Sequence, residues 1–277
     1  MMKKPQISVI ISTYNAVAWL KKTLAGYSVQ NNLDFELVIA DDGSSEETGK
    51  FLEEFQKESP VPVIHVWHED DGFQKSRILN KAILACNSDY ILMSDGDCIP
   101  RRDFVKMHLK YREEGYFLSG GYFKLPMDIS ENITEEDIIE QRCFDKSWLK
   151  THGLKSSVKN TKLTAGRKRA FVLNNLTPTG ATWNGHNASG WKKDILAVNG
   201  FDERMQYGGQ DRELGERLSN YGIKSKQIRY SAVCVHLDHP RGYKTPESIA
   251  YNKKIREETR EEKKVFTQFG IEKSGRN

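Results

Sequence analysis

Cysteine is scarce in this chain: there are four among 277 residues, and no two have the C-x-x-C spacing of a zinc site. Cys86, Cys98, Cys143 and Cys234 are dispersed, which favours free thiols in a reducing compartment over a disulfide framework. No apolar run reaches the roughly 18 residues that a membrane span requires. The N-terminal stretch MMKKPQISVIISTY has no small-residue cleavage site, so we expect a first strand there rather than a signal peptide. These absences predict a cytoplasmic protein and leave open a peripheral contact with the inner face of the membrane.

A strong excess of one charge is also absent. The 42 Lys and Arg residues and 38 Asp and Glu residues give a net charge of +4, with a pI near 8.7. This mild basicity fits a polyanionic ligand or an anionic membrane surface. A nucleic-acid-binding protein usually has a denser basic footprint, so we expect no nucleic-acid partner.

Apolar runs and helical spacings alternate through the first hundred residues. We expect strands at 7–11, 35–40, 63–67 and 90–93, with helices at 16–30, from Ser44 or Ser45 through Phe55, and at 74–86. Such alternation is typical of a doubly wound, mostly parallel α/β sheet, in which ligands bind beyond the carboxyl ends of the strands. The polar loops 12–15, 41–44 and 94–97 follow three of these strands, so we expect the functional site there.

The second half of the chain has a different pattern. We expect a helix at 104–114, a strand at 118–123 and a charged helix at 247–268. Between Lys146 and Lys193 there is no acidic residue, and the stretch 146–169 has eight Lys or Arg residues in what we expect to be a loop. Three interpretations of this basic stretch remain open: a mobile lid over a ligand, a surface that faces anionic lipid or a phosphorylated glycolipid, and a plain solvated loop.

The tripeptide Asp95-Gly96-Asp97 directly follows an apolar run. Two carboxylates one residue apart at a strand end can flank a hard divalent cation, and Gly96 lets a ligand approach the backbone closely. Taken alone, Asp-Gly-Asp is more often a turn. Its position after the fourth expected strand favours a metal site.

Four segments occur in one order before residue 101: SVIISTYN, FELVIADDGSS, GFQKSRILNKAI and YILMSDGDCIP. In this order and spacing they resemble the nucleotide-binding half of the GT-A glycosyltransferases, family 2 in particular. The later segment NGHNASGWKKDILAVNGFDERMQYGGQDRELGERLSNYG is similar to the C-terminal segment of β-1,4-galactosyltransferases and chondroitin polymerases. The resemblance implies an α/β GT-A fold, which is Rossmann-like, with a central mostly parallel sheet, flanking helices and a C-terminal acceptor-binding segment.

The resemblance also divides the chain into parts. Residues 1–120 would form the nucleotide-sugar-binding half, and residues 121–245 the acceptor-binding and catalytic half of the same domain. Residues 246–277 would form a C-terminal charged helix.

The family's donor-binding roles fall on the polar loops. Ser12, Tyr14 and Asn15 belong to the Ser-x-Tyr-Asn loop that lines the nucleotide pocket. The second aspartate of DDGS, Asp42, would accept a hydrogen bond from the N3–H of uracil. Asp42 could instead cap a helix, and Tyr14 could be partly buried in the core.

The diphosphate and the sugar would meet other side chains. Lys75, Arg77 or Asn80 would reach the diphosphate or support the pocket, although a solvated helix face is an equal alternative. Asn187 would lie near the donor sugar.

The resemblance implies a metal site with three ligand candidates. Asp97 would bind the metal directly, and Asp95 would contact the ribose or a metal-bound water. A histidine in VCVHLDHPRG would complete the site, with His236 favoured over His239 because it directly follows an apolar run. Imidazole together with carboxylates suits Mn²⁺ somewhat better than Mg²⁺.

The general base of the similar enzymes is the aspartate of a Trp-Gly-Gly-Glu-Asp motif, which reads here from Tyr207 to Asp211. The resemblance therefore implies that Asp211 takes the proton of the acceptor hydroxyl. The alternative is that Asp211 is simply an acidic residue at the N-terminus of a helix. Gln210 replaces the family's glutamate, which keeps hydrogen-bonding reach to the acceptor and removes a charge.

Together these roles imply an inverting, metal-dependent transferase that moves a hexose or N-acetylhexosamine from a UDP-sugar to a glycan or glycolipid, as in polysaccharide or lipopolysaccharide biosynthesis. One rival is a nucleotidyltransferase on a related fold, but such enzymes usually have a Gly-rich basic loop where this chain has Ser-Thr-Tyr-Asn. The other rival is a non-catalytic sugar- or nucleotide-binding module. That module would be expected to lack the DxD motif or the base, and the sequence retains both.

Overall fold

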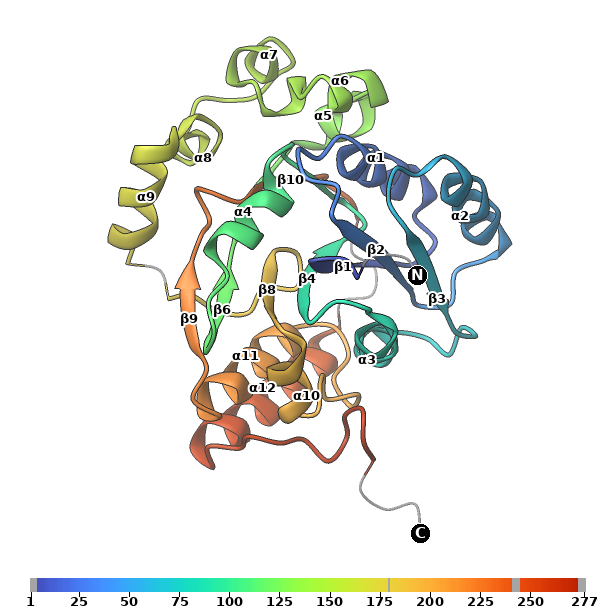
Figure 1. The fold of residues 1–277 in the computed structure, drawn as a ribbon, viewed down its shortest axis with the longest axis vertical. Helices are drawn as coiled ribbons and strands as arrows, with labels where there is room; N and C mark the ends of the chain where they lie inside the picture. Colours follow the sequence, from blue (N-terminus) through green and yellow to red (C-terminus); the bar gives the residue numbers. More distant parts are fainter. Residues whose placement is uncertain (1–3, 179, 241–244, 274–277) are drawn as a thin grey trace.

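The structure is a computed structural model that describes residues 4–178, 180–240 and 245–273. Its centre is a seven-stranded sheet of order β3-β2-β1-β4-β8-β6-β9, covered by helices on both faces (Figure 1). A three-stranded sheet of order β5-β10-β7 lies beside it. This α/β architecture with a large, mostly parallel sheet confirms the fold class expected from the sequence.

Four parallel strands form one half of the large sheet. A helix connects each of these strands to the next and returns the chain to the end of the sheet at which every strand begins. β1 pairs in parallel with β2 and β4, and β2 pairs in parallel with β3. The strands are β1 (Ile7–Thr13), β2 (Phe35–Asp41), β3 (Val63–Trp67) and β4 (Tyr90–Asp95). The helices between them are α1 (Val17–Ser28), α2 (Glu46–Glu58) and α3 (Lys75–Ala85).

Two apolar layers fix the helices on the sheet. α1, α2 and α4 (Phe104–Tyr111) pack on one face, and α3, α10 (Lys192–Ala197) and α11 (Gln210–Asn220) pack on the other. Neither layer covers the carboxyl ends of β1, β2 and β4, where the polar loops that follow these strands lie.

The other half of the large sheet begins antiparallel. β8 (Ala188–Trp191) lies between β4 and β6 (Tyr116–Ser119) and is antiparallel to both, while β9 (Lys224–Gln227) is parallel to β6. The strand expected at 118–123 is broken at Gly120, where a Cβ atom would lie 2.0 Å from Asn187 Oδ1. The Asn187 side chain thus separates β6 from β7 (Gly121–Lys124), which joins β5 (Cys98–Pro100) and β10 (Val233–His236) in the small sheet.

The basic stretch is helical rather than the loop that we expected. After α5 (Met127–Asn132), α6 (Glu135–Ile139) and a 3-10 turn (Arg142–Phe144), the chain forms α7 (Lys146–Thr151), a second 3-10 turn (Val158–Asn160), α8 (Thr161–Thr164) and α9 (Arg167–Leu176). We expected a loop from the sequence, but α9 has six strong helix formers after the N-cap Gly166, namely Arg167, Lys168, Arg169, Ala170, Leu173 and Leu176.

The charged C-terminal helix, α12 (Pro246–Glu261), is shorter than the expected 247–268. Lys263 has a positive φ of 51°, which turns the chain back toward the body. There the Asn199 side-chain amide donates to the carbonyl oxygens of Thr267 and Glu272 at 2.7 and 2.8 Å. The last four residues of the expected C-terminal segment, 274–277, lie outside the described residues.

All four cysteines are buried free thiols, as their dispersed positions predicted. Among the helices of residues 4–178, 180–240 and 245–273, none has both the length and the apolar character that crossing a bilayer requires.

Candidate active site

A cavity of about 980 Å³ opens at the carboxyl ends of β1, β2 and β4. Of the residues that the sequence predicts for the site, the cavity is lined by Ser12, Tyr14, Asn15, Asp42, Lys75, Asp95, Asp97, Gln210, His236 and His239. The remaining four, Arg77, Asn80, Asn187 and Asp211, are not among its lining residues. The polar loops thus meet in one place, as the strand order predicts.

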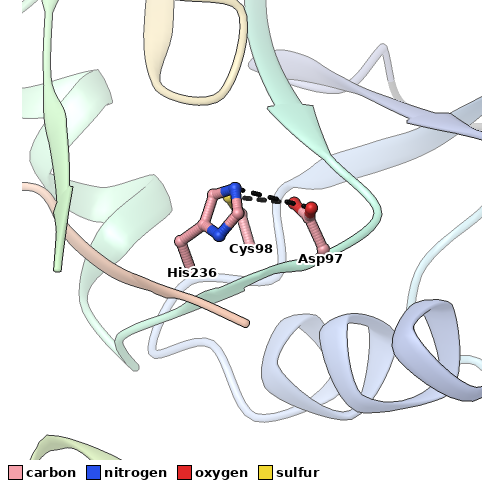
Figure 2. A group of neighbouring side chains, drawn as sticks. All are labelled: Asp97, Cys98 and His236. Carbon is pink, nitrogen blue, oxygen red and sulfur yellow. Dashed lines mark hydrogen bonds and ion pairs between the residues drawn. The ribbon is translucent and has the colours of Figure 1, made fainter. Parts of the chain in front are cut away.

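Asp97 faces two histidines because of the pairing in the small sheet. β10 is antiparallel to β5 and sets His236 opposite Cys98. His236 Nε2 is 3.5 Å from Asp97 Oδ2, and His239 Nε2 is 2.8 Å from the same oxygen. Figure 2 shows the His236 ring directed at the Asp97 carboxylate, with the Cys98 thiol behind the ring. A carboxylate and two imidazoles therefore converge at one corner of the cavity.

This corner has the donor set of a divalent-cation site. One ligand atom each from Asp97, Cys98 and His236 lie within 4.8 Å of one another. Burial raises the pKa of the Cys98 thiol well above its ordinary value. Thiolates select soft metals, whereas Mn²⁺ prefers oxygen ligands, so sulfur is the least suitable of the three for a hard divalent cation. A carboxylate with imidazole suits Mn²⁺, so the residues present fit the metal that the sequence predicts.

Asp95 is paired with a lysine that also lines the cavity. Lys75 Nζ donates to Asp95 Oδ1 at 2.7 Å, and Ser12 Oγ donates to the same oxygen at 2.9 Å. Burial opposes the charged form of Asp95, but the Lys75 ammonium outweighs it and holds the pKa of this carboxyl well below its usual range. Burial likewise opposes the charge on Lys75, and the Asp95 carboxylate raises its pKa instead. Both groups are therefore charged at neutral pH, and a fixed cation faces the cavity.

The loops after β1 and β2 form the end of the cavity to which the sequence resemblance assigns the nucleotide. Asp42 is buried, and its two carboxylate oxygens contact His68 Nε2 at 2.9 Å and the Gln74 N–H at 3.0 Å. A carboxylate has about four acceptor positions, so Asp42 can accept a further bond from a base edge. Burial raises its pKa, and the hydrogen bond from His68 opposes that effect. Tyr14 is half exposed and donates to Asp70 Oδ2 at 2.8 Å, so partial core burial, the alternative for this residue, is not seen.

Asn15 locks the loop after β1 to the loop after β2. Its backbone has a positive φ of 44°, and its N–H donates to Ser44 Oγ at 2.8 Å. In return its side-chain oxygen accepts from the Ser45 N–H at 2.9 Å. Asn15 therefore positions the cavity wall in addition to lining it.

Asp211 is the second residue of α11 and adjoins the cavity through its neighbours. Its Oδ2 accepts from the Gly185 N–H at 3.1 Å, and its Oδ1 accepts from the Arg212 N–H at 2.8 Å. Gln210, directly before it, is buried and lines the cavity. The carboxylate thus ties the loop at 185 to the start of the helix, and at the same time lies at the edge of the site.

Arg77 and Asn80 do not join the cavity, although Lys75 on the same helix does. Successive helical residues rotate by about 100°, so Arg77 lies on the opposite side of α3 from Lys75. There Arg77 is 3.6 Å from Glu203 and lines a separate hollow of about 360 Å³. Asn80 is buried and bonds both the N–H and the carbonyl of Phe201 at 2.8 and 2.9 Å. Both residues support the turn after α10 rather than a diphosphate.

Asn187 is in the protein core and is not among the residues that line the cavity. It is fully buried, and its amide donates to the carbonyl oxygens of Gly121 and Ala232 at 2.9 and 3.1 Å. Its side-chain oxygen is 3.0 Å from His108 Nε2. Because burial lowers the pKa of His108 to about 3, this ring is neutral and its Nε2–H is the donor. Asn187 therefore links β7, the start of β10 and α4.

We expect Asn187→Ala to destabilise the protein by about 3 kcal/mol, since three buried polar groups each lose a hydrogen bond. The free energy of unfolding from urea denaturation measures this. Asn132→Ala is the control, because the exposed Asn132 amide bonds only a carbonyl of its own helix at 2.8 Å. If Asn187→Ala left stability unchanged and weakened donor binding, the pocket role expected from the sequence would be right after all.

Two histidines and a tyrosine belong to the site although sequence reasoning did not select them. His186 and Tyr122 line the cavity with their rings 4.7 Å apart, and Tyr122 is 5.0 Å from the ring of His236. Burial lowers the pKa of His186, and the carboxylates of Asp95 and Asp211 oppose this. His186 stands next to Asn187 in NGHNASG, so the motif marks this part of the site, but nothing in it indicates which of the two side chains faces the cavity. His68, which contacts Asp42, belongs to a segment without a recognisable motif, so no signal in the sequence marks it.

Comparisons with known proteins give matches to glycosyltransferases. A family model described as Glycosyl transferase family 2 matches residues 8–171. The chain is 26% identical over 270 residues to the uncharacterized glycosyltransferase YfnE of Bacillus subtilis, covering 88% of this chain and 68% of that protein. It is 28% identical over 246 residues to the chondroitin synthase of Escherichia coli, covering 84% of this chain and 35% of that protein. The chain thus spans about two thirds of the first relative and about a third of the second.

Solved structures share the fold at low sequence identity. A mannosyltransferase from Pyrobaculum calidifontis, in complex with GDP-Man and Mn²⁺, matches with a TM-score of 0.58 and 17% identity, covering 87% of this chain and 59% of that one. TarS of S. aureus (residues 1–349), in complex with UDP, matches with a TM-score of 0.59 and 14% identity, covering 91% of this chain and 64% of that one. These similarities concern the fold.

Proposed function

The chain belongs to glycosyl transferase family 2, and from this premise we propose that it transfers a hexose or N-acetylhexosamine from a UDP-sugar to a hydroxyl group of a glycan or glycolipid. The observation that carries the proposal is the meeting of Asp95, Asp97 and His236 in one cavity at the end of β4. The relatives support it, since they include a chondroitin synthase and structures named as complexes with UDP and with GDP-Man.

The donor would bind across the loops that line the cavity. Asp42 offers a carboxylate to the N3–H of the base, beside the half-exposed ring of Tyr14. Lys75 offers a charged ammonium to the diphosphate, since its pairing with Asp95 leaves two of its three N–H groups for other acceptors. The end of the cavity formed by Tyr122, His186 and Gln210 would then receive the sugar and the acceptor.

Asp97, together with His236 or His239, would hold a divalent cation. When bound, such an ion neutralises the charge that builds on the leaving diphosphate. Asp95 would contact the ribose or a water on the ion, while Ser12 and Lys75 hold its carboxylate in place.

The reaction would be a single in-line displacement at the anomeric carbon. The acceptor oxygen forms the new bond as the bond to the diphosphate oxygen breaks, and Asp211 takes the proton of the acceptor hydroxyl. Attack from the side opposite the leaving group inverts the anomeric configuration, so an α-linked donor gives a β-linked product.

A screen of nucleotide sugars tests the proposal. We expect release of UDP from one UDP-hexose or UDP-N-acetylhexosamine in the presence of Mn²⁺, and no release with EDTA. GDP-mannose serves as the comparison donor. Turnover of a nucleoside triphosphate with a sugar phosphate would indicate the nucleotidyltransferase instead, and tight UDP binding without any turnover, also with glycan acceptors present, would indicate a binding module.

A further inference from the structure

Charge is segregated along this chain to a degree that the net charge of +4 conceals. The segment 146–193 holds 10 of the 42 Lys and Arg residues and none of the 38 Asp and Glu residues. The rest of the chain therefore has 32 basic and 38 acidic residues, a net charge of −6. The segment is therefore a region of concentrated positive charge in a protein whose other residues have a net negative charge.

Helix α9 presents this charge together with apolar side chains. Arg167, Lys168 and Arg169 form its first turn and are all exposed. Phe171 and Leu176 follow with 61% and 74% of their surface exposed, and Val172 is also exposed. Ala170 is the one residue of α9 that is buried. The outward side of α9, which also has the exposed Asn175, thus combines basic and apolar side chains, as helices that lie in a membrane interface do.

α9 is fixed to the body by its inner side and is not a detached segment. The Asn174 side chain donates to Ser231 Oγ at 2.9 Å and accepts from the Tyr230 N–H at 2.9 Å. Figure 1 shows α9 at the outer edge of the molecule, on the other side of the sheet from α2. The exposed face of α9 is thus held in a defined orientation.

The same surface adjoins the candidate active site. Lys162 in α8 donates to the Tyr122 carbonyl oxygen at 2.8 Å, and the Tyr122 ring lines the cavity. Val158, 90% exposed, precedes Lys159 in the turn before α8. A planar surface in contact with α9 would therefore lie near the end of the cavity that holds Tyr122 and His186.

We propose that α9, with the turn at Val158, docks the protein on an anionic lipid bilayer. The basic residues bind the lipid headgroups, and Phe171, Val172 and Leu176 enter the interface between headgroups and acyl chains. Charge complementarity favours an anionic surface as the occupant, and a symmetric contact with a second copy of the chain would place the same positive charge on both sides. A ten-residue helix is also only about 15 Å long, which is small for one side of a stable protein interface of roughly 800 Å². The docking does not depend on which sugar or acceptor the site uses.

Vesicle flotation of the full chain tests the proposal. The vesicles contain phosphatidylglycerol with phosphatidylcholine, or phosphatidylcholine alone. We expect binding to the first kind only, and weaker binding as salt shortens the Debye length from about 10 Å at 0.1 M to 3 Å at 1 M. Each Lys or Arg near such a surface contributes about 1 kcal/mol, so R167S/K168S/R169S should lower the partition coefficient about 100-fold.

Two matched controls separate this surface from general charge and hydrophobicity. K57S/K253S/K254S removes three exposed lysines on α2 and α12 and should keep most of the binding. F171S/L176S should lower binding at least about 10-fold, since burying one such side chain is worth about 1.5–3 kcal/mol when complete. L33S/L84S, which changes two other exposed leucines, should not. Thermal unfolding and donor hydrolysis of each variant report separately on folding and on the site.

The proposal is overturned if the unaltered protein does not float with phosphatidylglycerol vesicles. It is also overturned if the α9 variants and their controls lose binding equally. Sedimentation equilibrium gives the third contrary result: a dimer that F171S/L176S dissociates, without vesicle binding, would assign the face to a second copy.

Discussion

Asp211→Asn should reduce glycosyl transfer by about 10³-fold or more and leave UDP affinity within a few-fold of the unaltered protein, because a positioned general base contributes about 10²–10⁴-fold. The substitution retains an oxygen for the Gly185 N–H, which Asp211 now binds at 3.1 Å, so the loop at 185 should stay in place. The substitution removes the ability to take a proton, and it also removes one of two acceptor oxygens, since Oδ1 now accepts from the Arg212 N–H at 2.8 Å. Transfer rate with saturating donor, and UDP affinity by calorimetry, measure the two effects.

Glu216→Gln is the matched control for this experiment. It also removes one negative charge from α11, but its partner is Arg256, 2.5 Å away, and it is not among the residues lining the cavity. We expect near-normal transfer from this variant. If Asp211→Asn showed near-normal transfer together with a loss of stability, Asp211 would not be the base. Its role would then be structural, as an acidic residue at the N-terminus of α11 that holds the loop at 185.

Removal of Asp97, the proposed metal ligand, should have an effect of similar size. We expect Asp97→Asn to lower transfer about 10³-fold, since a metal ion supplies several kcal/mol of stabilisation to a developing negative charge. The loss should match that of the unaltered protein in EDTA, which the same UDP-release assay measures. A second readout does not need turnover: added Mn²⁺ should raise the thermal unfolding midpoint of the unaltered protein and not that of the variant.

The two histidines can be assigned by the same readouts. We expect His236→Ala to lose more of the Mn²⁺ response than His239→Ala, because His236 is fixed at the end of β10 while His239 lies beyond it. Cys98→Ser is the control, because its thiol donates to Asp97 Oδ1 at 3.4 Å but is not a ligand that Mn²⁺ prefers, so this variant should keep its Mn²⁺ response. Full transfer activity of Asp97→Asn in EDTA would contradict a metal-dependent reaction.

The parallel half of the fold could be predicted from the sequence because each element has a local signal. β1, β2, β3 and β4 are short apolar runs, and each of the three helices between them has its own apolar spacing. β6 and β7 had no such signal to separate them. Their break at Gly120 depends on the side chain of Asn187, which is distant in sequence.

Some residues of the candidate site could likewise be predicted from the sequence, and others could not. Ser12 and Asp95 lie at the carboxyl ends of β1 and β4, and Asp42 directly follows β2. These strands are parallel neighbours, so the meeting of the three residues was predictable from strand order alone. Arg77 and Asn187 were not, since the direction of a side chain depends on what packs around it. Asn187 and His186 are neighbours in the chain, yet one enters the core and the other the cavity.

What the sequence determined by itself was the row of carboxylates at the ends of the parallel strands, because a parallel sheet brings those ends to one edge. Only the tertiary structure decided what faces them. The antiparallel register of β5 with β10 brings His236 opposite Cys98 and within 3.5 Å of Asp97, and no local pattern fixes a register between strands so far apart in the chain. Folding likewise turned a run of basic residues, expected as a loop, into a helix with one oriented face, since the contacts of Asn174 with residues 230 and 231 are tertiary.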